Sequence, residues 1–235
     1  MIVLSDRLRT AAGLCRRGVT VCDVGTDHAY LACWLAQNGA ERVIASDVRD
    51  GPLEAARRTV EQQGARNVTL VKSDGLDKIG YADDVVIAGM GGELIARIVL
   101  GCRFLTEDTR FILQPMTKAD ILRRELYRSG FEIAEERTAR EGGRLYTVML
   151  VKFTGIKREM DELFCRCGKI TDPDMLRHIA GKLLKNAAGM ERSRKPRDSA
   201  EYGEDGKSTA RHYRELAGEI LARAEDIENR QKNKE

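Results

Sequence analysis

Five short apolar runs alternate with segments of helical character between residues 19 and 130 of this chain. The runs are rich in aliphatic residues and are bounded by turn residues, which is typical of strands buried on both faces of a parallel sheet. They occupy residues 19–24, 42–48, 68–71, 84–88 and 111–113. Strands and helices in alternation predict a doubly wound α/β sheet, in which ligands bind beyond the carboxyl ends of the strands.

The segments between and after these runs support the same architecture. Asp50 and Pro52 stand at the start of one predicted helix and Gly64 stands at its end, which are positions that these residue types favour. Further along, two extended stretches, residues 132–138 and 145–153, are joined by the segment AREGG and predict a hairpin. Two antiparallel strands that close a five-stranded parallel sheet are unusual for a dinucleotide-binding fold.

The rest of the chain, from Gly155 onward, is highly charged and contains two helical stretches. Each carries apolar residues in alternating steps of four and three, which is the seam of a coiled coil. The seams are Leu176, Ala180, Leu183, Ala187 and Met190 in the first helix, and Tyr213, Ala217, Ile220, Ala224 and Ile227 in the second. The polar connector, residues 193–207, allows the helices to pair antiparallel. We therefore predict an α/β domain over residues 1–153 and a helical coiled-coil domain over residues 154–235.

The composition limits the kinds of partner that the chain can have. A net charge of +3 produces no strong overall field, so nucleic acid is neither required nor excluded. No apolar run approaches the roughly 20 residues that span a bilayer, and the first residues lack a signal-peptide core, so we expect a cytoplasmic protein without a membrane partner. The six cysteines contain no CxxC pair, and the CxC of Cys165 and Cys167 has no second Cys or His pair nearby. We expect reduced thiols and no bound metal.

The first predicted strand leads into the sequence DVGTDHAY, residues 23–30. Gly25 allows a tight turn there, but Asp27 stands where a dinucleotide-binding fingerprint has its second glycine. A carboxylate at this point repels a pyrophosphate and suits a ligand that carries positive charge and no phosphate. S-adenosylmethionine has this character, because it carries an ammonium and a sulfonium group. An equally good interpretation is that Asp27 caps a helix that begins near His28.

Acidic residues also follow the second and third predicted strands. Asp47 is placed to accept hydrogen bonds from both hydroxyls of a ribose. Asp74, which precedes Gly75, is placed to accept a hydrogen bond from an adenine amino group, although the segment SDG is also typical of an ordinary turn. Because acidic residues occur at three strand ends, we favour a site for an adenosine-containing ligand.

Glycines dominate the end of the fourth predicted strand, AGMGG, residues 88–92. They allow the backbone to approach a ligand closely, so that a flat base can pass over Gly91 and Gly92. Gln114 follows the fifth strand, where its amide either reads a base edge at the rim of the pocket or faces water.

The segments DVGTDHAYL, ASDVRDGPLEAA, SDGL, IAGMGG and LQP occur in an order and at spacings that resemble the bacterial tRNA (adenine-22-N1)-methyltransferase family, TrmK. The resemblance covers residues 5–153, and the helical tail looks like the C-terminal coiled coil of that family. Two features depart from the family pattern. Ala32 and Cys33 follow Leu31 where a proline-containing pair is common, and Asp47 replaces a frequent glutamate.

This resemblance implies a fold and an activity. The fold is the Rossmann-like class I methyltransferase fold, a seven-stranded mixed sheet whose last two strands form an antiparallel hairpin, followed by an antiparallel coiled coil. The activity is transfer of a methyl group from S-adenosylmethionine to N1 of an adenine in the D-arm region of tRNA, at position 22. The alternatives are a methyltransferase for another RNA, a protein or a small molecule, and a non-catalytic interaction protein built around the coiled coil. We expect a monomer.

The resemblance and the residue pattern together assign roles to the strand ends. Asp27 is the predicted catalytic residue, since a carboxylate beside the base can stabilise its growing positive charge or take a proton from its amino group. His28 either contacts the cofactor or only occupies the first helical turn, and Tyr30 either lies in the core or lines the base pocket. The predicted cofactor contacts are Asp23, Gly25, Asp27, His28, Tyr30, Asp47, Asp74, Gly75, Ala88, Gly89 and Met90, and the predicted substrate contacts are Gly91, Gly92, Gln114, Arg192, Arg194 and Lys195.

A tRNA substrate requires a basic surface for its phosphates. Positive charge is concentrated on the first tail helix and just after it, at Arg177, Lys182, Lys185, Arg192, Arg194, Lys195 and Arg197. Because few acidic residues oppose this charge, we favour contact with RNA over a merely solvated helix face.

Overall fold

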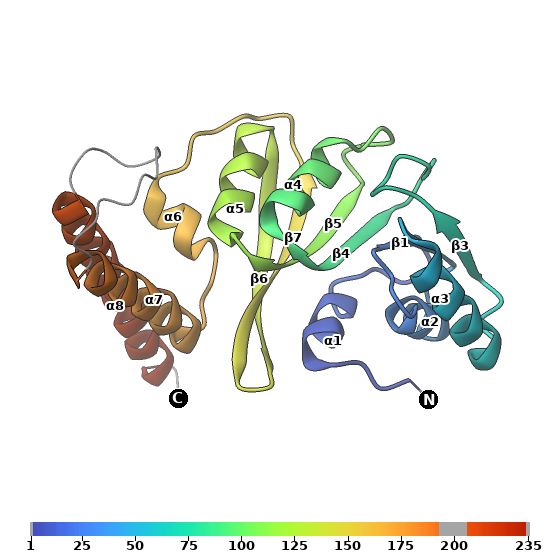
Figure 1. The fold of residues 1–235 in the computed structure, drawn as a ribbon, viewed down its shortest axis with the longest axis horizontal. Coiled ribbons are helices and arrows are strands. Elements are labelled where there is room, and N and C mark those ends of the chain that lie inside the picture. Colours follow the sequence, from blue (N-terminus) through green and yellow to red (C-terminus); the bar gives the residue numbers. More distant parts are fainter. Residues whose placement is uncertain (1, 193–205, 234–235) are drawn as a thin grey trace. The chain divides into compact units, whose positions relative to one another are not determined.

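The computed structural model describes residues 2–192 and 206–233 and divides the chain into two compact units, Met1–Met160 and Asp161–Glu235. The first unit contains the strands β1 Thr20–Val24, β2 Arg42–Asp47, β3 Val68–Lys72, β4 Asp84–Gly91, β5 Arg110–Thr117, β6 Phe131–Glu141 and β7 Arg144–Phe153. They form one sheet in the order β3-β2-β1-β4-β5-β7-β6 (Figure 1). The first five strands are parallel, and β7 pairs antiparallel with both β5 and β6, which confirms the predicted mixed sheet.

Two details of the sheet differ from the prediction. β4 and β5 continue past their predicted ends, as far as Gly91 and Thr117. The hairpin is tighter than predicted, because only Gly142 and Gly143 form its turn and the rest of AREGG belongs to β6. Both glycines have positive φ, 57° and 73°, a backbone that matches the twist of the flanking strands in a two-residue turn.

Helices cover both faces of the sheet. They are α1 Asp6–Ala12, α2 Tyr30–Gln37, α3 Asp50–Gln63, α4 Gly92–Leu100 and α5 Ala119–Arg128. α1, α2 and α3 pack on one face around an apolar cluster that includes Val21 and Val43, and α4 and α5 pack on the other (Figure 1). α3 begins and ends as predicted, with Gly64 in the left-handed conformation that ends a helix. The sequence pattern does not predict α1, which is short and largely polar.

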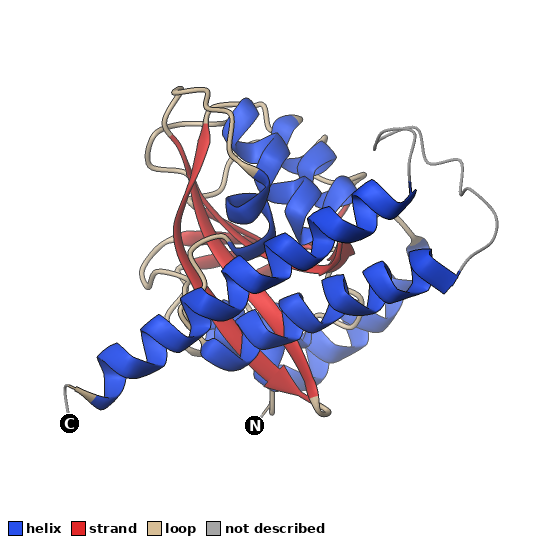
Figure 2. Ribbon diagram, turned by 90° about the vertical axis from the view of Figure 1, so that its left-hand side faces the viewer, coloured by secondary structure: helices blue, strands red, loops and turns tan. Residues whose placement is uncertain are grey.

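The second unit is helical and consists of α6 Glu162–Cys167, α7 Pro173–Arg192 and α8 Gly206–Lys232. α7 and α8 lie side by side (Figure 2). Two ion pairs show that they run antiparallel, since Arg177 pairs with Glu228 at 2.6 Å and Arg214 pairs with Glu191 at the other end. The predicted coiled coil is therefore confirmed. The connector residues 193–205 lie outside the described residues.

The predicted seams account for the packing of α7 on α8. Met190 and Ile227, the last residue of each seam, are half-buried. The other seam residues are buried, namely Leu176, Ala180, Leu183, Ala187, Tyr213, Ala217, Ile220 and Ala224. Several of these are alanines, whose small side chains allow the two helix backbones to approach closely.

The first compact unit extends beyond its last strand. The backbone N–H of Thr154 donates to the Gly130 carbonyl at 2.9 Å, and that of Arg158 donates to the Tyr127 carbonyl at 2.9 Å. The unit therefore reaches Met160, past the boundary that we place between residues 153 and 154. Whether each unit acts as a separate functional domain stays a prediction.

The cysteines and the helices place limits on other kinds of site. Cys165 and Cys167 are buried in α6. Among residues 2–192 and 206–233, no group of three or more His, Cys, Asp or Glu side chains is placed to hold a metal ion. No helix in this part of the chain is long and apolar enough to cross a membrane.

Candidate functional site

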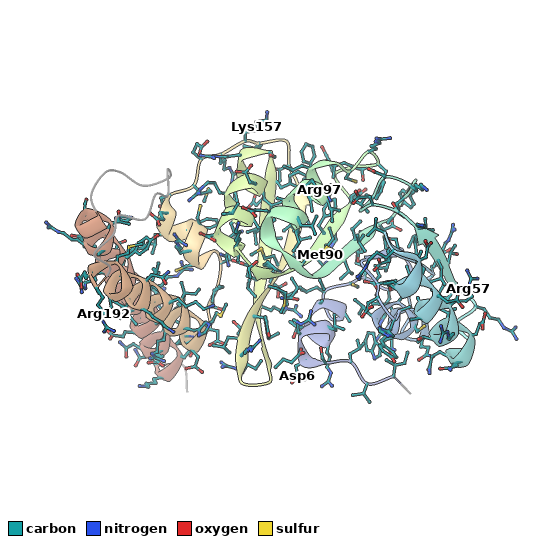
Figure 3. All side chains as sticks on the ribbon, in the orientation of Figure 1. Asp6, Arg57, Met90, Arg97, Lys157 and Arg192 are labelled. Carbon is teal, nitrogen blue, oxygen red and sulfur yellow. The ribbon has the colours of Figure 1, made fainter. Side chains whose placement is uncertain are left out.

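A ligand can enter the sheet between the carboxyl ends of β1 and β4. The chain leaves β1 toward α2 on one face and leaves β4 toward α4 on the other, and a crevice forms where neighbouring strands diverge in this way. Met90, labelled in Figure 3, lies in the segment AGMGG at the end of β4. Its side chain packs over Gly25, because a Cβ atom on Gly25 would lie 2.3 Å from Met90 Cε. The structure thus brings together two predicted motifs that are far apart in the sequence.

The turn after β1 holds a buried carboxylate. Gly25 has a φ of 74°, and the N–H groups of Gly25 and Thr26 donate to the Ser46 carbonyl at 2.8 and 2.9 Å. Asp23 is 4% exposed and accepts a hydrogen bond of 2.6 Å from Thr26 Oγ1. Burial raises the pKa of Asp23 to about 6, with a smaller contribution from Asp47 and against the lowering effect of Thr26. A cationic group bound beside Asp23 would favour its charged form.

The next residues have an unusual backbone. Asp27 and Ala29 both have positive φ, 50° and 56°, a conformation that is unfavourable for residues other than glycine and is often found at ligand sites. α2 begins only at Tyr30, and no side chain caps it, so the alternative that Asp27 caps this helix is wrong. Instead, Asp27 Oδ2 lies 2.9 Å from His28 Nδ1 at the surface.

His28 and Tyr30 form an exposed aromatic pair beside Asp27. Their rings are stacked, with centroids 5.8 Å apart and an interplanar angle of 8°. Tyr30 is 52% exposed, so the alternative that places it in the core is wrong. His28 precedes α2 and therefore does not occupy the first helical turn. Two parallel rings at the surface offer a flat area on which a nucleobase can stack.

The carboxylates at the next two strand ends differ in burial. Asp47 is 6% exposed and accepts a hydrogen bond of 3.0 Å from the backbone N–H of Arg49. Asp74 is exposed and lies 3.3 Å from the guanidinium of Arg97 on α4. Gly75 follows it with a φ of 53°. The structure therefore places both carboxylates at the predicted edge of the sheet and also confirms that Asp74 is in a turn.

The glycines in the last part of β4 and at the start of α4 have different surroundings. Gly89 is exposed and has a φ of 85°, and it lies next to Ala88 and Met90 at the crevice. Gly92 is buried, and a Cβ atom there would lie 2.2 Å from the Lys118 carbonyl oxygen. The absence of a side chain at Gly92 is therefore explained by packing, and the substrate contact of this residue stays a prediction. Gly91 remains half-buried beside Thr117.

The prediction that Gln114 lies at the rim of the pocket is wrong. Its side chain is fully buried, because β5 continues through this residue instead of ending before it. The amide oxygen accepts hydrogen bonds from Arg7 Nη1 at 2.7 Å and from the Gly89 N–H at 3.0 Å. Arg7, on α1, was not among the candidate residues, since its partner is 107 positions away and no local pattern indicates the pair.

Cys22 lies next to Asp23 on β1 and is also fully buried. Burial raises the pKa of the Cys22 thiol well above its ordinary value, and the nearby charge of Asp23 raises it further. Cys22 is therefore a buried, neutral thiol within β1.

Part of the predicted basic surface of α7 is neutralised. Arg177 pairs with Glu228 and with Asp174, so its charge is opposed, contrary to the prediction. The side chains of Lys182, Lys185 and Arg192 are exposed and make no ion pair within the described part of the chain. Arg194, Lys195 and Arg197 lie outside the described residues.

Comparisons with known proteins identify the family of this chain. A family model described as a methyltransferase domain matches residues 4–149. The tRNA (adenine(22)-N(1))-methyltransferase of Bacillus subtilis is 35% identical over 187 residues, which cover 77% of this chain and 79% of that protein.

Solved structures extend the similarity to the helical tail. The crystal structure of the B. subtilis m1A22 tRNA methyltransferase TrmK matches with a TM-score of 0.81 and 30% identity, over 94% of this chain and all of that chain. The Streptococcus pneumoniae protein Sp1610, solved with S-adenosyl-L-methionine, matches with a TM-score of 0.75 and 28% identity, over 93% of this chain and all of that chain. Since the sheet order, the paired tail helices and the sequence all agree over most of its length, the chain belongs to the TrmK family of tRNA (adenine-22-N1)-methyltransferases.

Proposed function

We propose that this protein transfers the methyl group of S-adenosylmethionine to N1 of the adenine at position 22 of tRNA. The observation that carries the proposal is the family membership, because the similarity includes both the sheet and the helical tail. A tRNA substrate supports a cytoplasmic location. A monomeric state remains a prediction.

The residues at the strand ends fit S-adenosylmethionine. Asp23 provides a buried carboxylate for the ammonium group, and Gly25 allows close approach of the backbone. Asp47 provides acceptors for the ribose hydroxyls, and Asp74 provides one for the adenine amino group. The bound cofactor supplies an electrophilic methyl group.

In this proposal, the exposed residues bind the acceptor base. Adenine N1 has a lone pair in the ring plane, so it can attack the methyl group directly, without a protein nucleophile, once the two are aligned. A base in folded tRNA is stacked and has to be extruded, and the His28–Tyr30 stack offers it a replacement surface. The Asp27 carboxylate beside this stack stabilises the positive charge that the base acquires, or accepts a proton from its amino group.

The tail supplies contacts to the tRNA backbone in this proposal. Lys182, Lys185 and Arg192 place positive charge on one long helix, which suits phosphates spaced along an RNA strand. Arg194 and Lys195 continue the same charge in the sequence.

The decisive experiment is nucleoside mass spectrometry of unmodified tRNA after incubation with the protein and S-adenosylmethionine. We expect 1-methyladenosine at position 22, and none in a tRNA that carries guanosine there. Methylation at another position or of another RNA would contradict the proposed substrate. Failure to bind S-adenosylmethionine in a calorimetric titration would instead favour a non-catalytic interaction protein.

A further inference from the structure

Three elements meet at the buried amide of Gln114. On β5, Gln114 Oε1 accepts hydrogen bonds from Arg7 Nη1 of α1 and from the backbone N–H of Gly89 at the end of β4. Gln114 Nε2 donates to the Pro115 carbonyl at 2.9 Å. Arg7 and the Gly89 N–H can only donate and a carbonyl can only accept, so these three partners fix the orientation of the amide.

Arg7 is itself held from the other side. Its backbone N–H donates to Glu141 Oε2 at 3.1 Å, and its Nε lies 3.7 Å from the same carboxylate at the tip of the β6–β7 hairpin. Its guanidinium group lies 5.9 Å from the centroid of the Tyr146 ring on β7. The side chain is 19% exposed, so it is largely removed from water. Arg7 therefore has one position, set by the hairpin and by Gln114.

The contacts of Arg7 and Gln114 affect the position of Gly89. This residue has a φ of 85° and is followed by Met90, whose side chain packs over Gly25 at the other side of the crevice. A Cβ atom on Gly89 would lie 3.6 Å from Arg7 Nη1, so the guanidinium group lies directly beside this bulged part of β4. The hydrogen bond from Gly89 to Gln114 therefore helps to fix the Gly89–Met90 bulge relative to Gly25.

We propose that Arg7 is a positioning residue for methyl transfer, which acts through Gln114 to fix the Gly89–Met90 bulge of β4 beside the β1 turn. This inference rests on the proposed function, with the reactants bound at the crevice between the ends of β1 and β4. Arg7 touches neither reactant in this role. It sets the alignment on which a direct displacement depends, and a misplacement of about 1 Å can lower such a rate about a hundredfold.

Single-turnover methylation of tRNA tests this role. Arg7→Met keeps a long apolar side chain and removes the donor, so we expect kcat to fall about tenfold or more while KM for tRNA and affinity for S-adenosylmethionine change less than about threefold. Gln114→Met and the double variant should be about as slow as Arg7→Met and no slower, because the two residues act as one unit. Arg7→Lys, which can still donate to Gln114, should recover most of the rate. Arg9→Met, a matched change on the exposed side of α1, should leave the rate unchanged.

Amide exchange provides a readout that does not depend on activity. In the free protein, the Gly89 N–H should exchange faster in Arg7→Met and in Gln114→Met than in the wild type. An inactive wild type would contradict the proposed function and leave this exchange result intact. Three results would each exclude the positioning role. One is a kcat for Arg7→Met within about twofold of the wild type, and another is a double variant whose loss of kcat is the product of the two single losses. The third is a loss of cofactor affinity and thermal stability in Arg7→Met that is as marked as its loss of kcat. If Arg7→Met does not fold, a comparison of the kcat of Gln114→Met with that of Arg7→Lys tests the same positioning role.

Discussion

Asp23 and Asp27 lie on the same turn, but their surroundings differ. Asp23 is buried against Thr26 and has a raised pKa of about 6, whereas Asp27 is exposed and paired with His28. A buried carboxylate binds a cation strongly because little water competes, and an exposed one can meet an arriving substrate. We therefore expect Asp23 to determine cofactor affinity and Asp27 to determine the rate of methyl transfer.

The raised pKa of Asp23 predicts a pH dependence of cofactor binding. Binding of an ammonium group favours the ionised carboxylate, so affinity for S-adenosylmethionine should fall as the pH decreases through about 6. Asp23→Asn should weaken binding about tenfold or more at pH 8 and abolish this pH dependence, because it removes a charge-assisted hydrogen bond. Isothermal titration between pH 5 and pH 8 measures both effects.

Protein stability provides the control for Asp23→Asn. The folded state holds a proton on Asp23 up to about pH 6, whereas an unfolded aspartate loses it near its ordinary pKa of 3.8, so the free energy of unfolding falls as the pH rises between these values. Without cofactor, Asp23→Asn should therefore be more stable than the wild type at pH 8, by up to about 3 kcal/mol. A variant that is less stable at pH 8 would indicate that the lost affinity reflects misfolding.

Asp27 is best tested by Asp27→Asn, because asparagine tolerates the left-handed backbone of this position better than alanine does. We expect kcat to fall about tenfold or more, with cofactor affinity unchanged, since the variant removes the charge that stabilises the cationic base. Stopped-flow or quenched methylation assays measure the rate. Normal turnover in this variant would remove Asp27 from the mechanism.

Gly25 and Gly18 form a matched pair for testing close approach at the β1 turn. Both have positive φ, 74° and 67°, but a Cβ atom meets Met90 at Gly25 and nothing within 4 Å at Gly18. Alanine at either position should lower the free energy of unfolding by about 1–2 kcal/mol. Only Gly25→Ala should also lose cofactor binding, because its methyl group displaces the Met90 side chain. Equal cofactor affinity in the two variants would count against the packing of Met90 on Gly25.

At the scale of elements, the strands could be predicted because their apolar runs are long enough and end in turn residues. The length of β4 and β5 could not be predicted, since glycines and a proline at their ends normally stop a strand. This explains the error at Gln114, which was placed past a strand that in fact contains it. The left-handed backbone at Asp27 and Ala29, and with it the His28–Tyr30 stack, depends on packing that a motif does not reveal.

The exposed face of α7 predicts a salt-dependent contact with tRNA. Lys182→Glu with Lys185→Glu should weaken tRNA binding and flatten its dependence on salt, because each lost phosphate contact removes about one released counterion. Lys232→Glu, near the end of α8, is the matched control and should bind as the wild type does. Filter binding at several salt concentrations measures the slope. An unchanged slope in the double variant would exclude this face of α7 from the interface.

At the scale of the molecule, each compact unit has a core of its own. A fragment of residues 1–160 should therefore keep its affinity for S-adenosylmethionine, whose predicted contacts all lie in the first unit, and lose most of its affinity for tRNA. Titration with the cofactor and filter binding with tRNA separate the two results. Full tRNA affinity in the fragment would assign the RNA contacts to the first unit.

The whole-chain organisation was largely accessible from the sequence. The carboxyl ends of parallel strands lie at the same edge of a sheet, so Asp23, Asp47 and Asp74, near the ends of three strands, could be predicted to lie along that edge. Contacts between distant segments could not be predicted. Arg7 with Gln114 and Arg177 with Glu228 each join positions whose surroundings in the sequence give no sign of the partner.

The buried thiol of Cys22 has a further consequence for an enzyme that handles an alkylating reagent. A thiolate is a far stronger nucleophile than a ring nitrogen, and one beside a sulfonium donor would be methylated in place of the substrate. Cys22 is fully buried, and burial together with the charge of Asp23 raises the pKa of its thiol. The carboxylate that we propose for the cofactor therefore also favours the protonated, less reactive form of this cysteine.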